Sequence, residues 1–554
     1  MSEDFIEEAL VKRLQAKNEI LTVSLNFRQI ISDSKKVDYV HDLLLENDML
    51  PDLIIDRKCN EKSDYFRKMG NQKFVKKLPK EAVELYTQSI AHAENNSREI
   101  SLAYANRSAV LFEYKLYKEC IEDINQAISN NYPNDLKPKI ELRKSKALEL
   151  ITYQFNIDYT KPLPSIPKGD QNPLIQSASK SVEIKYTPEE GRFVVASRDI
   201  KPGDLIANEK PLFSIITNEF HIHCHECLKI CYNLIPCERC TQALYCSQNC
   251  KKEAYKKYHK YECAIMVTLR NNGMNKLDLI AMRIAILIRD DFNQSSLTAV
   301  EENSIYRSDR YTEIHNLVTN REKRTASDLF QKAATTAILY HYLKTNTNFF
   351  DETSNYEENF KELVLLHRQT SACNFHNINA DLVVINENST KQLGIDAMNY
   401  NCIASGAYSF LSMFNHSCSP NVLRLSCGIN SIVIALEPIK KGEKCLDNYG
   451  YHYALMTKQE RQHSLKDQYK FVCNCDACEH DYPCYQSLPQ YGEESVSNED
   501  FKIIMERDSE KIEKLYGRII KALDKIRYPK PSKNLADLQE MLKACVFIGF
   551  KVPF

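Results

Sequence analysis

The sequence predicts an α+β multidomain chain, and three observations carry that prediction. A repeated pattern of two amphipathic helices fills residues 60–150. Short β-rich runs, separated by turn residues, occur at 183–220 and again at 401–452. Cysteines gather in between, with eight of the chain's 20 lying between positions 224 and 263. A chain of 554 residues is long enough for several domains of ordinary size.

Composition excludes several classes of protein. Lys and Arg number 73 against 74 Asp and Glu, so the chain has no general attraction to nucleic acid or to an anionic membrane. The start, MSEDFIEEALVKRL, lacks the basic segment and apolar core of a secretion signal. No run approaches 18 apolar residues, the length needed to span a bilayer. We expect a cytoplasmic and nuclear protein without a membrane partner, and nucleic-acid binding is disfavoured.

Residues 1–59 are expected to be an N-terminal helical region, and the repeats follow it. The first copy, FRKMGNQKFVKKLPKEAVELYTQSI, starts at Phe66, and the second, YANRSAVLFEYKLYKECIEDINQAI, starts at Tyr104. Small residues hold matching positions, as Gly70 and Ser108 do, and a third copy begins near Leu136. The pattern resembles tetratricopeptide helix pairs, which stack into a concave solenoid. A plain helical bundle is the alternative.

Five polar residues in these repeats fit a carboxylate clamp of the kind that holds chaperone C-terminal peptides. On the inner helices they could grip a terminal carboxylate through charge-assisted hydrogen bonds. The residues are Arg67, Asn71, Asn106, Lys139 and Arg143. Solvated helix faces are the alternative reading.

The rest of the chain divides by composition. A Pro-rich stretch, KPLPSIPKGDQNPLIQ, marks a linker over 151–182. Turn signals at Pro188, Gly191 and Pro202-Gly203 break residues 183–220 into short strands. The remaining predicted segments are a cysteine-rich stretch at 221–263, a mostly helical insertion at 264–400, strands at 401–452, a second cysteine-rich stretch at 453–479 and a helical region at 480–554.

The first cysteine-rich stretch contains four pairs of potential metal ligands. A pair separated by a few residues can reach one ion from a single turn, and four pairs make two tetrahedral sites. In a long chain without a secretion signal, metal ligation is favoured over disulfides. Coincidental spacing is the alternative. The pairs are Cys224 and Cys227, Cys237 and Cys240, Cys246 and Cys250, and His259 and Cys263.

The second cysteine-rich stretch contains FVCNCDAC, which supplies Cys473, Cys475 and Cys478. Tetrahedral zinc needs a fourth ligand. Cys418, in the turn FNHSCSPN, is the natural candidate, because a metal would then tether that polar turn to a distant segment. Spacing alone leaves other cysteines open for the same role, namely Cys427, Cys445 and Cys484. Together the stretches predict three zinc ions.

Several motifs in order resemble one family. NHSCSPN, GEKCLDNYGYHY (442–453) and DQYKFVCNCDAC (467–478) look like the second half of a SET domain with its post-SET zinc loop, and GRFVVASRDIKPGD (191–204) looks like the first part. The stretch at 221–263, with its YCSxxC element, resembles a MYND zinc finger. This combination resembles the SMYD lysine methyltransferases. The tetratricopeptide helices in front point to the SET and MYND domain-containing protein 4 subgroup.

The resemblance implies methyl transfer from S-adenosylmethionine to a protein lysine. Tyr449 would lie near the transferring methyl and Tyr469 would line the lysine channel. The cofactor residues would be Glu190, Gly191, Arg192, Asn415, His416 (mainly through its backbone), Tyr449 and Phe471, with Ser412, Asn374 and Tyr408 as weaker candidates. In the MYND pattern one ion takes Cys224, Cys227, Cys246 and Cys250, and the other takes Cys237, Cys240, His259 and Cys263.

Two positions depart from the family pattern. Phe193 stands where many relatives have a second glycine, and Asn448 precedes Tyr449 where other branches have an apolar residue or Ser. Neither change removes a reactive group. The competing function is a scaffold or transcriptional co-repressor, in which a MYND finger recruits proline-rich or co-repressor partners and the SET core is weak or inactive.

Overall fold

The computed structural model describes residues 6–154, 164–292, 305–351, 356–380, 401–493, 495–506, 508–525 and 529–549. The chain forms two compact units, each assembled from segments that are far apart in sequence. The first unit comprises Met1–Tyr159, Ile215–Phe292 and Thr325–Arg368, and the second comprises Thr160–Ser214, Asn293–Arg324 and Gln369–Phe554. Within the described ranges, each helix is too short or too polar to cross a bilayer.

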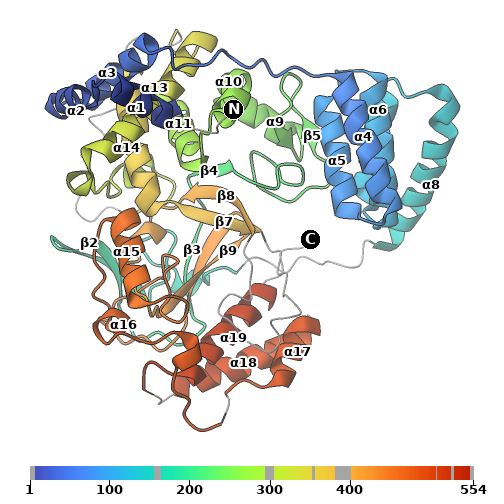
Figure 1. Ribbon diagram of the computed structural model, residues 1–554. Helices are drawn as coiled ribbons and strands as arrows, with labels where there is room; N and C mark the ends of the chain where they lie inside the picture. The colour runs from blue at the N-terminus through green and yellow to red at the C-terminus, as the bar shows by residue number, and fades with distance from the viewer. Residues whose placement is uncertain are drawn as a thin grey trace. The chain divides into compact units, whose positions relative to one another are not determined.

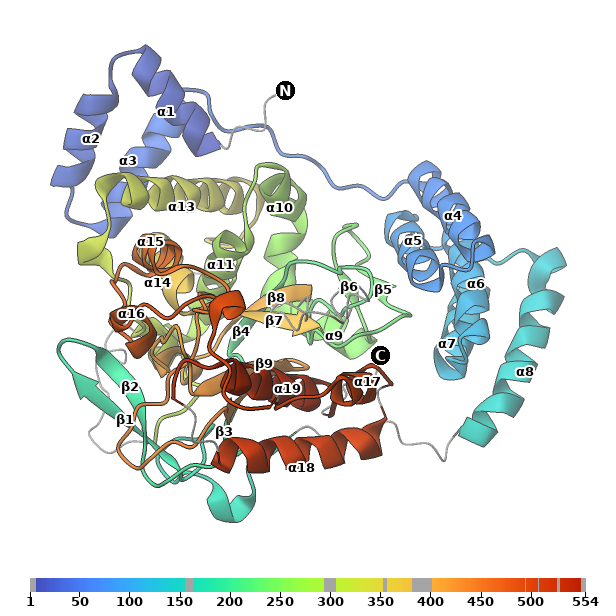
Figure 2. The same cartoon turned by 60° about the horizontal axis from the view of Figure 1, so that its bottom comes forward.

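The first unit begins with three helices that pack on a long one. Their apolar stripes meet α13, where the rings of Phe27 and Phe330 lie edge to face with centroids 5.2 Å apart. Ser32 caps the third helix, because its side chain accepts from the backbone N–H of Lys35. Figure 2 shows the three helices beside α13. Their bounds are α1 (Ile6–Ala16), α2 (Ile20–Gln29), α3 (Asp33–Glu46) and α13 (Ala326–Asn346).

The predicted repeats form consecutive antiparallel helix pairs, which Figure 1 shows side by side. Small residues let the helices approach, because a Cβ on Gly70 would come within 2.7 Å of the Tyr86 ring. Arg107 is fully buried and donates two hydrogen bonds to Asp123, at 2.7 and 2.8 Å. The helices are α4 (Asn60–Val75), α5 (Pro79–His92), α6 (Arg98–Glu113), α7 (Tyr117–Ser129) and α8 (Lys137–Gln154).

The first cysteine-rich stretch packs against these helix pairs within the same unit. Arg107 Nη1 also donates to the Leu234 carbonyl at 3.1 Å, and Asp56 accepts from both the backbone and the hydroxyl of Thr241. Regular structure in the stretch is short, and further helices follow it. They are β5 (Ile235–Pro236), β6 (Leu244–Tyr245), α9 (Gln248–Ala254), α10 (Lys260–Asn271), α11 (Lys276–Ile288) and α14 (Tyr356–Asn374).

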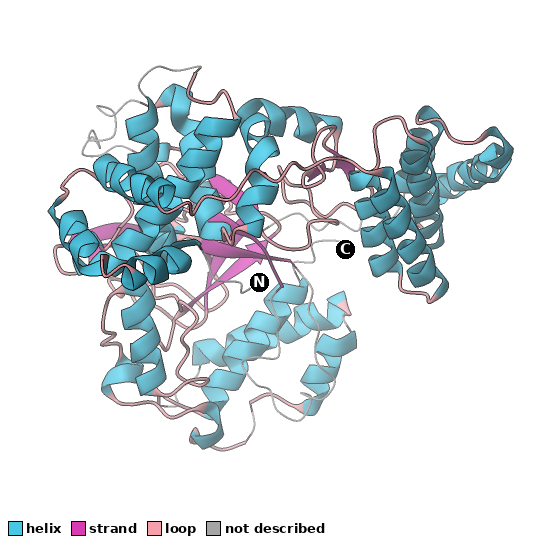
Figure 3. Cartoon of the chain, turned by 45° about the horizontal axis from the view of Figure 1, so that its top comes forward, coloured by secondary structure: helices cyan, strands magenta, loops and turns pink. Residues whose placement is uncertain are grey.

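The second unit is built on short antiparallel sheets, drawn in magenta in Figure 3. One sheet has the order β3-β10-β9 and another β4-β8-β7, while β1 and β2 pair in a hairpin. In the first sheet Ser431 lies opposite Ser426 on one side and Glu209 on the other. The strands are β1 (Val182–Thr187), β2 (Gly191–Ala196), β3 (Leu205–Glu209), β4 (Phe213–Ile216), β7 (His376–Ala380), β8 (Asn401–Ala407), β9 (Val422–Cys427) and β10 (Asn430–Ala435).

Helices complete the second unit. Ile432 and Ile434 of β10 share one apolar core with Leu515 and Ile519 of α18, so the C-terminal helices cover a face of the β3-β10-β9 sheet. Figure 1 shows α18 and α19 packed together below the strands of this unit. The helices are α12 (Tyr311–His315), α15 (Lys458–Tyr469), α16 (Asp476–Glu479), α17 (Asn498–Glu506), α18 (Ser509–Lys525) and α19 (Lys533–Gly549).

One element differs from the conformation that the sequence predicts. Residues 264–400 were expected to be mostly helical, yet β7 occupies His376–Ala380 and pairs with β8, with Ile378 opposite Ala404. Ile378 is fully buried in that sheet. The segment HNINA is too short to predict a strand by its own pattern. It becomes one because it pairs with β8, which lies beyond the insertion. The part of the expected linker at 155–163 lies outside the described residues.

Candidate active site and metal centres

Three groups of four metal-ligand side chains come together, each with its ligand atoms within 4.8 Å of one another. All 20 cysteines are free thiols, so disulfides do not compete for these sulfurs. The first two groups lie in the first unit and the third in the second unit. The groups are Cys224, Cys227, Cys246 and Cys250; Cys237, Cys240, His259 and Cys263; and Cys418, Cys473, Cys475 and Cys478.

These groups have the composition of closed structural metal sites. Four soft sulfur or imidazole ligands at tetrahedral spacing suit zinc. Cys240 Sγ lies 3.5 Å from His259 Nε2, and Cys227 Sγ lies 3.7 Å from Cys246 Sγ, so each group could close around one ion. The pairs take alternate groups along the chain, which is the interleaved arrangement that the resemblance implied.

Cys418 joins the third group across a gap of more than fifty residues. Its Sγ lies 3.5 Å from that of Cys478, and its backbone N–H points at the sulfur of Cys475 at 3.3 Å. The competing cysteines lie elsewhere, since Cys427 belongs to the core under the C-terminal helices and neither Cys445 nor Cys484 belongs to the group. The third group therefore ties the turn at 414–421 to the segment that follows α15.

The polar turn is held in place by pairing with residues 446–448. The Asp447 N–H donates to the Asn415 carbonyl at 2.9 Å, and the Ser417 N–H donates to the Asp447 carbonyl at 2.8 Å. Asn448 adds a side-chain bond to the Ser417 carbonyl at 2.9 Å and accepts from the Gly450 N–H. Asn448, which differs from the family pattern, therefore fits this structure, because its side-chain amide stabilises the turn at 414–421.

His416 has both ring nitrogens engaged. Nδ1 accepts from the backbone N–H of Tyr449 at 3.1 Å, so Nε2 carries the proton and lies 3.4 Å from Cys418 Sγ. Burial lowers the pKa of this imidazole to about 4, which keeps the ring neutral. The ring therefore links Tyr449 to the metal-ligand group, and only the backbone of His416 is left to meet a ligand.

Three aromatic residues converge beside this turn. The rings of Tyr449 and Tyr469 have centroids 4.8 Å apart, and Phe471 lies 6.2 Å from the His416 ring and 6.5 Å from that of Tyr469. The Tyr449 hydroxyl donates to the Phe414 carbonyl at 2.8 Å. Burial raises the pKa of both phenols, and the carboxylate of Asp447 adds to the rise at Tyr449. Both phenols therefore stay protonated at neutral pH.

The loop between β1 and β2 faces the same turn. Gly191 has φ +69°, a conformation that favours glycine, and a Cβ there would meet no atom within 4 Å, so the space above the loop is open. Glu190 accepts from Lys444 Nζ at 2.6 Å and from Asn415 Nδ2 at a long 3.5 Å. Arg192 points away, because its Nη2 donates to the Asn316 carbonyl at 2.7 Å. Of the three loop residues, Glu190 makes the contact with Asn415.

Phe193, the second departure, is buried with the Lys444 ammonium 5.0 Å from its ring centroid. The ring supports the lysine that pairs with Glu190, so its bulk lies under the loop. The weaker candidates form a chain of contacts: Ser412 Oγ lies 2.8 Å from the Asn374 carbonyl oxygen and 2.5 Å from that of Tyr408, and its one proton is donated to either of them. The Tyr408 hydroxyl donates to Ile429, which directs it toward the β9–β10 turn.

Glu209 is a buried residue near the turn that no sequence motif predicts. Glu209, 1% exposed at the end of β3, accepts from the backbone N–H groups of Phe410 and Leu411 at 3.0 and 2.8 Å. Its carboxylate thereby caps the short helical turn that leads to Asn415. Burial raises the pKa of this carboxyl to about 7. The only signal in the sequence is a lone acid in the apolar run LIANEKPLF.

The geometry fits a cofactor with an adenosine and an amino-acid end. Asn415 has one recorded side-chain contact within the described residues, and it is long, so its amide is available to a ligand. A Cβ on Gly191, next to Glu190, would meet no atom within 4 Å, and the half-buried ring of Phe471 lies 6.2 Å from that of His416. The residues expected to bind the cofactor are therefore brought to one place, with Arg192 the exception.

Comparison with known proteins finds similarity over the part of the chain that carries this site. A family model described as SET domain matches residues 191–450. The chain is 25% identical over 542 residues to Protein-lysine N-methyltransferase SMYD4 of Pongo abelii, covering 75% of this chain and 66% of that protein. It is 26% identical over 542 residues to SMYD4 of Mus musculus, covering 76% and 67%. It is also 28% identical over 298 residues to N-lysine methyltransferase SMYD2 of Homo sapiens, covering 53% and 59%. The chain spans about two thirds of the length of the SMYD4 proteins it matches.

Proposed function

We propose that the chain belongs to the SET and MYND domain-containing (SMYD) family and is a protein-lysine N-methyltransferase that uses S-adenosylmethionine. One observation supports this most strongly. The Cys418 group fastens the Asn415–His416 turn to the segment carrying Tyr469 and Phe471, and the His416 ring links both to Tyr449. Residues from three distant segments thus meet at one point.

In this proposal, S-adenosylmethionine supplies an electrophilic methyl group on a sulfonium. Asn415, the His416 backbone and Glu190 would hold the amino-acid end, and Phe471 would stack on the adenine. Tyr449 and Tyr469 flank the incoming lysine amine. The lysine nitrogen would form a C–N bond with the methyl carbon as the S–C bond breaks, and S-adenosylhomocysteine would leave with a neutral sulfur.

The two phenols orient the reactants and do not act as bases. Because burial raises their pKa, they remain protonated and offer hydrogen bonds and dipoles. The amine must be neutral before attack, and removal from water favours that state by lowering a lysine pKa. The proton it loses passes to solvent. Catalysis here is positioning plus desolvation, without a catalytic metal.

The test uses the zinc-loaded chain, tritiated S-adenosylmethionine and a lysine-containing peptide library. We expect label in lysine, identified by amino-acid analysis as methyl-lysine, and no label when every target lysine is replaced by arginine. Absence of transfer, with S-adenosylmethionine still bound, would leave the site a binding module. Absence of both would contradict the proposal.

We propose zinc in the three ligand groups, with structural roles in a MYND finger and a post-SET loop. The finger has little apolar core of its own, so metal binding would supply much of its folding free energy. We also propose that α4–α8 are tetratricopeptide repeats. A cytoplasmic and nuclear location remains a prediction.

A chaperone peptide at the predicted clamp is the finer part of this proposal. Asn71 and Asn106 adjoin, with Asn106 Nδ2 donating to Asn71 Oδ1 at 2.8 Å, and Lys139 is exposed. Arg67 pairs with Asp64, and Arg143 donates to the Ala105 carbonyl at 2.9 Å. Lys139→Ala should weaken binding of an acidic peptide with a free C-terminus but not of its amidated form. Equal binding of both forms would dismiss the clamp.

The scaffold function is the second candidate, and one contact favours it. Arg107 joins the helix pairs to the cysteine-rich stretch through Leu234, so two recruitment modules form part of one unit. Proline-rich or co-repressor partners would dock on the finger. Failure of the chain to bind S-adenosylmethionine would favour this function over the enzyme.

A further inference from the structure

Tyr469 sits at the end of a helix, where its backbone needs an outside partner. It is the last residue of α15, and Lys470 leaves the helix in the left-handed conformation with φ 64°. The carbonyl groups in the last turn of a helix have no partner inside it. The Tyr469 carbonyl finds one in Asn320 Nδ2, at 3.1 Å and 149 positions away in sequence.

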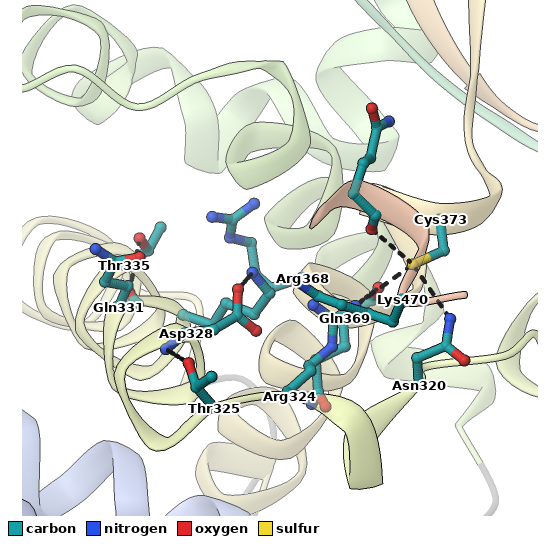
Figure 4. Close-up of polar contacts among 12 residues, drawn as sticks. Asn320, Arg324, Thr325, Asp328, Gln331, Thr335, Arg368, Gln369, Cys373 and Lys470 are labelled. Atoms are coloured by element: carbon teal, nitrogen blue, oxygen red, sulfur yellow. Dashed lines mark hydrogen bonds and ion pairs between the residues drawn. The ribbon is translucent and has the colours of Figure 1, made fainter. Parts of the chain in front are cut away.

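The backbone conformation of Asn320 orients its side chain for this contact. Its backbone is itself left-handed, with φ 52° and ψ 33°, a conformation that asparagine tolerates better than most residues. The same amide donates to Cys373 Sγ at 3.7 Å, near the end of α14. Figure 4 shows Asn320 and Cys373 facing each other, with a dashed line between them and Lys470 close by.

Further bonds fix the loop that carries Asn320. Arg324 donates from Nε to the Thr319 carbonyl and from Nη2 to the Gln369 carbonyl, at 2.8 and 2.9 Å. Arg324 Nη2 also lies 3.5 Å from Cys373 Sγ. The loop is therefore tied to the C-terminal turn of α14 at several points, and Asn320 has little freedom to move.

The same helix end reaches the cofactor side of the site. Asn374 Nδ2 donates to the Val318 carbonyl at 2.8 Å, and the Asn374 carbonyl accepts from Ser412 Oγ at 2.8 Å. Ser412 lies in the short turn that leads to Asn415. One network thus connects the backbone of Tyr469 to the turn that carries Phe414, whose carbonyl holds the Tyr449 hydroxyl.

We propose that Asn320 is a positioning residue that sets the separation of the Tyr469 and Tyr449 rings, and with it the room for the lysine amine and its methyl groups. This inference rests on the proposed function. The 4.8 Å centroid separation of these rings is the distance that Asn320 maintains. Loss of its amide would free the Tyr469 carbonyl and widen the opening without touching the residues that bind adenosine.

The test compares Asn320→Gly with wild type. Glycine accepts the left-handed backbone but removes both amide bonds. Asn131→Gly is the matched control, because Asn131 has φ 55° and donates from Nδ2 to the Asn96 carbonyl at 2.7 Å, in the helical repeats. Asn320→Asp is a second variant that keeps the side-chain shape but turns an acceptor toward the Tyr469 carbonyl.

The affinities for two ligands distinguish a loss of tyrosine positioning from a general loss of structure at the site. Sinefungin carries an amine where S-adenosylmethionine carries its methyl, so it reaches the two tyrosines, whereas S-adenosylhomocysteine ends at the sulfur. By calorimetry, Asn320→Gly should bind sinefungin about fivefold more weakly, while its affinity for S-adenosylhomocysteine changes less than twofold. Asn131→Gly should bind both as wild type does. Parallel loss of both ligands, or no loss, would overturn the inference.

Hydrogen exchange tests the contact itself, whatever the fate of the proposed function. In Asn320→Gly and Asn320→Asp the amides of 465–469, at the end of α15, should exchange faster, with those of 415–417 and Phe471 unchanged. Unchanged exchange at 465–469 would overturn the inference even if both ligands bind. If neither ligand binds the wild-type chain, the proposed cofactor fails, and exchange still decides whether Asn320 holds Tyr469.

Discussion

At the scale of single residues, Tyr449 is held by hydrogen bonds from both its side chain and its backbone. Its hydroxyl is committed to the Phe414 carbonyl and its backbone N–H to His416 Nδ1. Tyr449→Phe removes the hydroxyl while the ring still packs on Tyr469. We expect methyl transfer to fall at least tenfold, because the hydroxyl is proposed to lie beside the transferring methyl. The affinity for S-adenosylmethionine should stay within about fivefold of wild type, because a bond of this kind is worth about 1 kcal/mol.

The measurement is single-turnover transfer of tritiated methyl, alongside calorimetry. Tyr356→Phe is the control, since the Tyr356 hydroxyl also donates to a backbone carbonyl, that of Ala285, at 2.8 Å. Equal rates in the two variants would show that the Tyr449 hydroxyl has no role in transfer.

Glu209 predicts a pH dependence of stability. Its pKa is about 7 when folded and near the ordinary value of 4.5 when unfolded, so the folded state binds the extra proton between these values. Stability from this group is complete below about pH 4.5 and declines as pH rises to about 7, by roughly 3 kcal/mol in all. Glu209→Gln removes this slope, because an amide does not titrate.

Thermal unfolding of the two proteins between pH 5 and 7.5 checks this prediction. The melting temperature of the wild type should fall relative to that of Glu209→Gln as pH rises. A difference that stays constant across the range would mean that Glu209 is ionised throughout, or that its pKa is not raised.

Residue-scale prediction from sequence succeeded where residue types repeat at a fixed spacing. The cysteine pairs and the NHSC motif are recognisable in the sequence, and the structure brings the paired ligands and Cys418 into three groups. Glu209 and Asn320 could not be found in this way. Each is a single polar residue whose partners lie 53 or more positions away, so only the folded chain shows what it contacts.

At the scale of elements, the metal groups have separable roles. The Cys418 group holds the turn of Asn415, whereas the Cys237 group lies in the first unit. Cys418→Ser and Cys237→Ser should each lower bound zinc from three ions per chain to two. Only Cys418→Ser should weaken S-adenosylmethionine binding, by at least tenfold, because the turn loses its tether.

Zinc release with a chromogenic chelator, followed by calorimetry, checks both parts. Cys237→Ser serves as the matched control, since it removes the same kind of ligand. If the two variants bind S-adenosylmethionine equally, the third metal group does not shape the cofactor site.

Helix packing depends on a buried ion pair. Arg107 and Asp123 are both fully buried, and Arg107→Met leaves the carboxylate without its partner. We expect a loss of about 3–5 kcal/mol in the stability of the helix pairs. The control, Lys68→Met, removes an exposed partner of Asp64 and should cost under about 1 kcal/mol. Urea unfolding followed by hydrogen exchange in α4–α8 measures both, and similar costs would contradict the argument.

Elements were predictable where amphipathic periodicity is long, as in α4–α7, and where turn residues bracket strands, as around β1 and β2. The strand β7 was missed, because HNINA has no alternating pattern and becomes a strand only by pairing with β8. The packing of the repeat helices against the cysteine-rich stretch was also not predictable from the sequence. It depends on Arg107, whose bonds to the Leu234 carbonyl and to Asp123 are seen only in the folded chain.

At the scale of the whole molecule, the order of motifs along the chain predicted the class of protein better than any single motif did. A SET domain at 191–450 contains the cysteine-rich stretch as an insertion, and that arrangement agrees with the similarity to SMYD4 and SMYD2. Substrate choice is different, because it depends on the shape of surfaces that no motif encodes.

Binding of S-adenosylmethionine to the zinc-loaded chain is the most direct measurement. By calorimetry, the wild type should bind one equivalent, Asn415→Ala should lose at least tenfold in affinity, and Asn430→Ala, whose amide bonds Asn208 at a β-turn, should bind as wild type does. A wild-type chain that binds no S-adenosylmethionine, or an Asn415→Ala variant that binds it undiminished, would contradict the proposed site.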